Sequence, residues 1–130
     1  MKIHHIGILT KSLVETRNAL SSQGINFLTA IEDPLQQAIL TISKGDVKIE
    51  IVEPLHHNQQ LRKILDKFGT HSYHICFEVP QIDWPDVKKY FGHRLVMVSS
   101  PKPAILFNNR RVAFYISKHL GLIELLEELK

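Results

Sequence analysis

The sequence has little cysteine and no long apolar run. Its 130 residues include one cysteine, Cys76, so an intrachain disulfide is impossible and a reducing compartment is expected. No apolar stretch approaches the roughly 18–20 residues that cross a bilayer. The chain enters Lys2-Ile3-His4-His5 without an apolar leader of signal-peptide length. We therefore expect a cytoplasmic protein that has no membrane partner.

The sequence also lacks a concentrated basic region. The formal net charge is +3, but Lys and Arg alternate with acidic residues and form no long run. A nucleic-acid-binding surface needs a basic patch or stripe, so no nucleic-acid partner is expected. Apolar residues make up 44% and charged residues 22%, which is typical of a globular protein. A chain of this length suffices for one domain with its own core, and we predict a single domain over residues 1–130.

The order of expected elements repeats along the chain. In the first half, alternation and turn signals predict a strand, a helix from Ser12 to Gly24, and further strands, at residues 3–9, 25–31, 37–43 and 47–53. In the second half, a helix opening at Asp83 follows the first strand. The strand segments are 72–79, 95–98, 104–107, 111–117 and 122–126, with a break at Pro101–Pro103 and a turn at Asn108-Asn109, so this half has one segment more than the first. We predict an α+β fold of two βαβββ modules, about 1–55 and 71–130, linked by 56–70. Within the linker, Asn58 is expected to cap a short helix that Gly69 closes. Paired modules of this kind would form a curved, open-sided mixed sheet around a cleft.

Each module carries a His in its first strand and a Glu in its last. These residues are His5 with Glu50, and His74 with Glu124. A single His or Glu in a strand is more often hydrogen-bonded or solvated than a ligand, but the equivalent placing in both halves favours a metal site. Imidazole and carboxylate together suit divalent cobalt, manganese, nickel or zinc. Buried carboxylates cost several kcal/mol each unless they are paired. We predict that these four side chains bind one divalent metal.

Three further residues are candidates for substrate contact. Strand alternation places Cys76 on the same face as His74, although a small buried thiol is an equal alternative. Gln36 and Gln37 are adjacent, so one of the two amides is expected to face the cleft.

Four motifs in this order resemble the vicinal oxygen chelate superfamily, which includes glyoxalases, bleomycin resistance proteins and dioxygenases, and in particular its methylmalonyl-CoA epimerases. Residues 3–8 (IHHIGI) resemble the opening His-Ile-Gly strand, and residues 49–55 (IEIVEPL) are similar to a strand that ends in Glu-Pro-Leu. Residues 73–79 (YHICFEV) resemble the second His strand, and residues 111–114 with 122–125 resemble the closing hairpin. The resemblance covers nearly the whole chain.

The resemblance implies an enzyme that chelates a small-molecule substrate through neighbouring oxygens. Its metal would stabilise an enolate after a proton is removed next to a carbonyl, with an acyl-CoA thioester as the favoured substrate. Glu50 or Glu124 would carry the proton, and the chain would form a homodimer. Leu40 stands about where epimerases carry a second Glu, which departs from a two-base mechanism. The alternatives are a lactoylglutathione lyase (glyoxalase I), which also uses two His and two Glu, and a non-catalytic small-molecule binder.

Overall fold

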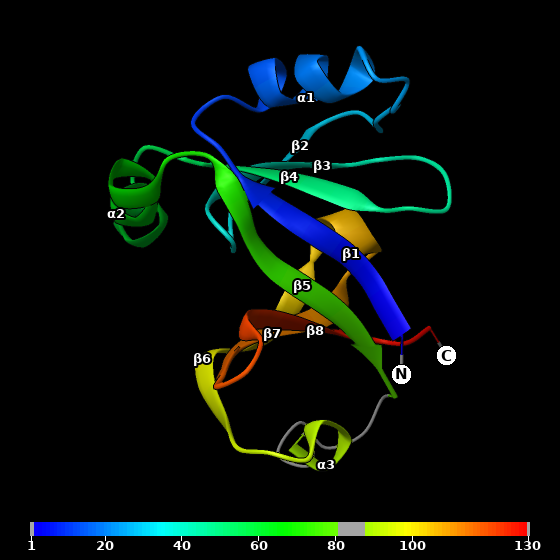
Figure 1. Cartoon of the computed structure of the whole chain (residues 1–130), viewed down its shortest axis with the longest axis vertical. Coiled ribbons are helices and arrows are strands. Elements are labelled where there is room, and N and C mark those ends of the chain that lie inside the picture. The colour runs from blue at the N-terminus through cyan, green and yellow to red at the C-terminus, as the bar shows by residue number, and fades with distance from the viewer. Residues whose placement is uncertain (1, 81–87, 130) are drawn as a thin grey trace. The chain divides into compact units, whose positions relative to one another are not determined.

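The computed structural model describes residues 2–80 and 88–129, which form eight strands, three α-helices and one 3-10 turn (Figure 1). In chain order these are β1 (Lys2–Leu9), α1 (Leu13–Ser21), β2 (Ile31–Asp33), β3 (Ala38–Ile42), β4 (Ile49–Pro54), α2 (Gln59–Phe68), β5 (His71–Val79), α3 (Lys88–Phe91), β6 (Leu95–Ala104), the 3-10 turn Ile105–Phe107, β7 (Arg110–Ser117) and β8 (Gly121–Glu127).

The chain divides into two compact units. The first unit runs from His5 to Tyr73, and the second contains the start of the chain through His4 together with the chain from His74 onward. The divisions therefore fall inside β1, between His4 and His5, and inside β5, between Tyr73 and His74. Each unit contains four neighbouring strands.

The first unit holds its strands in the order β2, β3, β4, β1. β1 pairs with β4 in parallel, whereas β4, β3 and β2 pair antiparallel. α1 lies alongside these strands (Figure 1). Ser12 caps α1 as predicted, because its hydroxyl accepts the Glu15 N–H at 3.2 Å. The Glu53 carboxylate on β4 accepts the Leu13 N–H at 2.8 Å, and so fixes the positive end of the helix to the sheet.

The second unit holds its strands in the order β5, β8, β7, β6. β5 pairs with β8 in parallel, and β8, β7 and β6 pair antiparallel. One face of these strands forms a hydrophobic core that includes Val79, Ala113, Tyr115, Ile123 and Leu125. Phe91 at the end of α3 packs against this core together with Phe77 and Leu95. The opposite face is thereby left for the polar residues of β5 and β8.

The two units repeat one plan. Each has a strand, a helix and three further strands, and in each the first strand lies parallel to the last. The predicted α+β class with two βαβββ modules and mixed strand pairing is confirmed. The predicted linker contains α2, which begins after its cap Asn58 and ends at Gly69, as expected from the sequence.

The predicted strand at 25–31 is wrong in its position. β2 covers only Ile31–Asp33, and before it a single bridge joins Phe27 to Ser43. The Thr41 hydroxyl donates a 2.6 Å hydrogen bond to the Leu28 carbonyl. The Leu28 N–H also donates to the Ile42 carbonyl at 3.0 Å, and the Lys44 N–H donates to the Asn26 carbonyl at 2.8 Å. The backbone pairing here is therefore a short stretch around one bridge to which a side chain adds a bond, which periodicity alone does not reveal.

The predicted break at Pro101–Pro103 and the strand at 104–107 are also wrong. β6 continues through both prolines to Ala104, and Ile105–Phe107 is a 3-10 turn. Among the described strands β6 lies at the edge of the sheet order, where a proline costs no ladder bond if its nitrogen faces outward. Two register shifts, at 97–99 and 99–102, absorb the irregularity. Asn108 and Asn109 then form the expected turn, with φ of 55° and 64°.

The described residues include only the end of the second predicted helix. Its expected start at Asp83 and Pro85 lies outside the described residues, and α3 corresponds to its end. Among the helices of residues 2–80 and 88–129, none is long and apolar enough to cross a membrane.

Candidate metal centre

The first unit buries His5 next to Glu50. Gly7 on β1 pairs with Glu50 on β4, and alternation places His5 on the same face as Gly7. His5 Nε2 lies 3.5 Å from Glu50 Oε1, and the two side chains are 0% and 3% exposed. The parallel pairing of the first and last strands of the module therefore brings this imidazole and carboxylate together, as the sequence predicted.

The second unit builds the same arrangement with His74 and Glu124. Cys76 on β5 pairs with Glu124 on β8, and His74 precedes Cys76 by two residues. His74 Nε2 lies 3.4 Å from Glu124 Oε1, and the side chains are 0% and 1% exposed. The Phe114 ring meets the His74 ring edge to face, with centroids 5.4 Å apart. In both units the His thus stands two residues before the partner of the Glu in a parallel ladder.

The separation within each pair suits metal ligands better than a hydrogen bond. A charge-assisted hydrogen bond between imidazole and carboxylate is about 2.7–2.9 Å long. Two ligands on one ion with bonds of about 2.1 Å lie about 3.0–3.4 Å apart, from octahedral to tetrahedral angles. The observed 3.4 Å falls at the upper end of that range, and 3.5 Å lies just beyond it. The donor set of buried imidazole nitrogens and carboxylate oxygens therefore fits a divalent metal.

Leu40 on β3 lies on the same face of the sheet as Glu50 on β4. Ile42 pairs with Glu50 and Leu40 pairs with Val52, so all four side chains share one face. Leu40 is 1% exposed, so a buried hydrocarbon side chain stands at this position. Along this part of β3 the first unit offers no second acid or base on the Glu50 face among its described residues.

The predicted substrate-contact residues have different surroundings. Cys76 is fully buried on the face of β5 that carries His74. Gln36 donates from Nε2 to Asp33 Oδ2 at 2.9 Å, within a turn that Asp33 caps. Gln37 is exposed with φ of 54°. Both glutamines precede β3 and lie in a turn, whereas the predicted strand began at Gln37.

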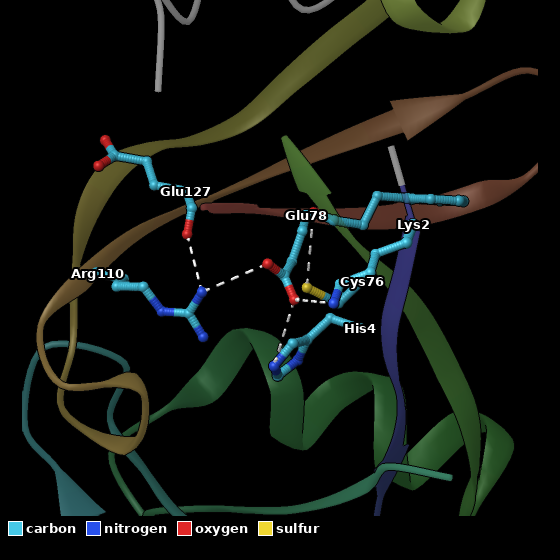
Figure 2. Close-up of polar contacts among 7 residues, drawn as sticks. Lys2, His4, Cys76, Glu78, Arg110 and Glu127 are labelled. Carbon is cyan, nitrogen blue, oxygen red and sulfur yellow. Dashed lines mark hydrogen bonds and ion pairs between the residues drawn. The ribbon is translucent and has the colours of Figure 1, made fainter. Parts of the chain in front are cut away.

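Glu78, on the same strand as His74, is the centre of a group of charged residues that was not predicted from the sequence. The Glu78 carboxylate contacts Lys2, His4 and Arg110 (Figure 2). Alternation along β5 could have indicated that Glu78 shares a face with His74, because Glu78 is four residues beyond it. The cationic partners come from distant segments, and no local pattern links them.

The fold carries one buried His–Glu pair in each unit, and comparison with known families identifies the class of protein to which it belongs. The model for the Glyoxalase/Bleomycin resistance protein/Dioxygenase superfamily matches residues 4–114. The chain belongs to this superfamily, as the sequence motifs predicted.

Solved structures of the same fold include methylmalonyl-CoA epimerases. A hypothetical protein from Bacillus halodurans C-125 is 25% identical with a TM-score of 0.81, covering 99% of this chain and 95% of that one. The methylmalonyl-CoA epimerase of Mycobacterium tuberculosis is 21% identical with a TM-score of 0.79, covering 98% and 88%. A variant of the Streptomyces coelicolor epimerase, in complex with 2-nitronate-propionyl-CoA, is 21% identical with a TM-score of 0.80, covering 100% and 99%. A comparison with curated protein sequences gives no match.

Proposed function

We propose that this chain is a metal-dependent enzyme of the isomerase or epimerase type that removes a proton next to a carbonyl group. The observation that carries the proposal is the pair of buried His–Glu contacts at 3.5 and 3.4 Å, built in the same way in both units. Both pairs together would hold one divalent ion, such as cobalt, manganese, nickel or zinc, through His5, Glu50, His74 and Glu124. When bound, the ion would polarise a substrate carbonyl and stabilise negative charge on its oxygen.

The chain's own residues would transfer the proton and exclude water from the site. Glu50 or Glu124 receives the proton from the carbon next to the carbonyl, and so acts first as the base and then as the acid. A proton delivered to a neighbouring carbon gives an isomer, and one delivered to the opposite face of the same carbon gives an epimer. Leu40, Phe114 and Cys76 limit water around the carboxylates, because they are apolar or weakly polar neighbours on the same faces. The favoured substrate is an acyl-CoA thioester. The 2-nitronate-propionyl-CoA complex and the methylmalonyl-CoA complex named for structural neighbours support this class.

Metal stoichiometry tests the proposed site. We expect one metal per chain by elemental analysis, and we expect His5→Ala and His74→Ala each to lose it or to weaken its affinity by at least about tenfold. His56→Ala is the matched control, since His56 is exposed in the linker. Two metals per chain, with each His variant losing one, would show two separate sites. Unchanged metal content in both variants would remove the proposal.

Exchange of the substrate proton tests the chemistry. Incubation of the metal-loaded enzyme with methylmalonyl-CoA in deuterated water is expected to incorporate deuterium next to the thioester carbonyl, as measured by mass spectrometry. Glu50→Gln and Glu124→Gln, compared at equal metal occupancy, identify the proton carrier, because the carrier's variant loses exchange most strongly. Absence of exchange with the wild-type enzyme on this and other acyl-CoA thioesters would exclude that substrate class.

Lactoylglutathione lyase is the second candidate. The buried Leu40 favours it, because a reaction with one proton carrier does not need a second carboxylate on the Glu50 face. Turnover of the hemithioacetal of methylglyoxal and glutathione, with nickel, cobalt or zinc bound, would establish this activity. Ligand stabilisation in a thermal-shift screen without any metal dependence would instead indicate a non-catalytic binder.

A further inference from the structure

Glu78 on β5 has three cationic or titratable groups around its carboxylate. Oε1 lies 3.7 Å from Lys2 Nζ and 4.0 Å from His4 Nε2, and Oε2 lies 3.6 Å from Arg110 Nη1 (Figure 2). The side chains of Glu78, His4 and Arg110 are 13%, 15% and 16% exposed, so the group is shielded but still reachable from solvent.

The group retains positive charge after these contacts. Arg110 Nη1 also donates to the backbone carbonyl of Glu127 at 3.1 Å, while the Glu127 carboxylate is paired with Arg111. Glu127 therefore does not neutralise Arg110. One carboxylate, that of Glu78, faces two permanent cations and a histidine, and the excess positive charge favours a further anion.

Arg110 has donors to spare for that anion. Both of its contacts among the described residues use Nη1, whereas a guanidinium carries five N–H donors in a planar fork. Figure 2 shows the rest of the guanidinium directed away from Glu78. The Glu78 and Glu127 contacts fix the plane of the fork, so the remaining donors are held ready for a carboxylate or phosphate.

The group lies on the face of β5 that carries the second His–Glu pair. His74, Cys76 and Glu78 alternate along one face, while Phe77 and Val79 point into the hydrophobic core on the other. Four residues of strand span about 13 Å, which is therefore the distance between the backbone positions of His74 and Glu78. A ligand on this face can contact both ends only if its anionic group is remote from the atoms at the metal pair.

We propose that Arg110, assisted by Lys2 and His4, forms a subsite for a carboxylate or phosphate of the substrate that lies far from its reacting carbonyl. Glu78 is a positioning residue that holds the three groups. This inference rests on the proposed function, which supplies the substrate to which the anion belongs. A carboxylate directly beside the reacting carbon is too close to the metal pair to reach Arg110. The anion therefore belongs to the thiol carrier, as a phosphate of coenzyme A or a carboxylate of glutathione.

Anion binding by NMR tests the subsite without using catalysis. Coenzyme A and glutathione are titrated separately into metal-free and metal-loaded protein, and amide shifts are followed around Glu78 and Arg110. We expect one of the two probes to bind, to weaken as salt is added, and to lose about tenfold in affinity in Arg110→Gln. Arg94→Gln is the control, because Arg94 is exposed and belongs to neither group. Arg110→Lys keeps the charge but not the fork, and an intermediate affinity is expected.

The outcomes separate this inference from the proposed function. Binding that depends on Arg110 in a protein that holds no metal supports the subsite and contradicts the metal enzyme. Metal binding and proton exchange with unchanged probe affinity in Arg110→Gln contradict the subsite alone. Equal losses in Arg110→Gln and Arg94→Gln indicate unspecific attraction by net charge and overturn the subsite. A lack of binding by either probe up to millimolar concentration overturns it as well. A preference for coenzyme A or for glutathione assigns the phosphate or the carboxylate.

Discussion

Tyr115 places a polar atom in an otherwise apolar environment. It is 4% exposed within the core of the second unit, and its hydroxyl has no hydrogen-bond partner within residues 2–80 and 88–129. Burial raises the pKa of the Tyr115 hydroxyl from its usual 10.0, because the ionised form would lose hydration. The neutral hydroxyl therefore contributes little favourable energy in the folded state.

We expect Tyr115→Phe to leave the free energy of unfolding unchanged or to raise it by up to about 2 kcal/mol, since a desolvated hydroxyl is removed. Tyrosine in the unfolded chain ionises near pH 10, before Tyr115 in the folded chain does. Wild-type stability should therefore fall as the pH rises above about 10, and the variant should lose less. Urea unfolding at neutral and alkaline pH measures both effects. A clear loss of stability at neutral pH would show that the hydroxyl has a partner.

The residue types at the candidate metal site were predictable because they recur at equivalent places in both halves. The sequence allowed His5 to be assigned to Glu50, and His74 to Glu124, through the strand order alone. The contacts of Glu78 were not predictable in the same way. They join residues 2–4, residue 78 and Arg110, and the direction of a long Arg side chain depends on packing rather than on local periodicity.

At the scale of elements, α2 depends on one cap. The Asn58 side chain accepts the Leu61 N–H at 3.2 Å, and its amide nitrogen donates to the carbonyls of Gln36 and Gln37. Asn58 thus holds the start of the helix and the turn before β3 at once. Its side chain is largely buried, so water does not readily replace these bonds.

We expect Asn58→Ala to destabilise the protein by about 1–3 kcal/mol, because a cap and two buried backbone partners are lost together. Gln59→Ala is the control, since Gln59 is exposed and should change stability by less than about 0.5 kcal/mol. Chemical denaturation measures the stability, and faster amide exchange in residues 59–68 would locate the loss in α2. Equal stability of the two variants would contradict the role assigned to Asn58.

Element types followed from the sequence where capping and turn residues agreed with periodicity. Ser12, Asn58, Gly69 and the Asn108-Asn109 turn all lie where they were expected. The errors arose where a side chain or a strand edge changed the rule. The hydroxyl of Thr41 supplements a short stretch of backbone pairing near Leu28, and an edge strand accommodates prolines that would end a central strand.

At the scale of the whole molecule, the metal is expected to contribute to stability. If all four ligands share one ion, metal added at a hundredfold excess over its dissociation constant should stabilise the folded chain by about 2.7 kcal/mol. For a chain of this size that corresponds to a rise of roughly 10 °C in Tm. Thermal unfolding of chelator-treated protein, with and without manganese, cobalt, nickel or zinc, measures the shift. His74→Ala should show no such rise, whereas His56→Ala should match the wild type.

β6 has a consequence for how copies of the chain meet. Its outer half carries Pro101 and Pro103 with Lys102 between them, and two register shifts bend it. Prolines cannot donate to a neighbouring backbone, and a lysine opposes the approach of another apolar strand. A second molecule therefore cannot extend the sheet along residues 99–104. The protein is protected there against the edge-to-edge polymerisation that leads from native sheets to fibrils.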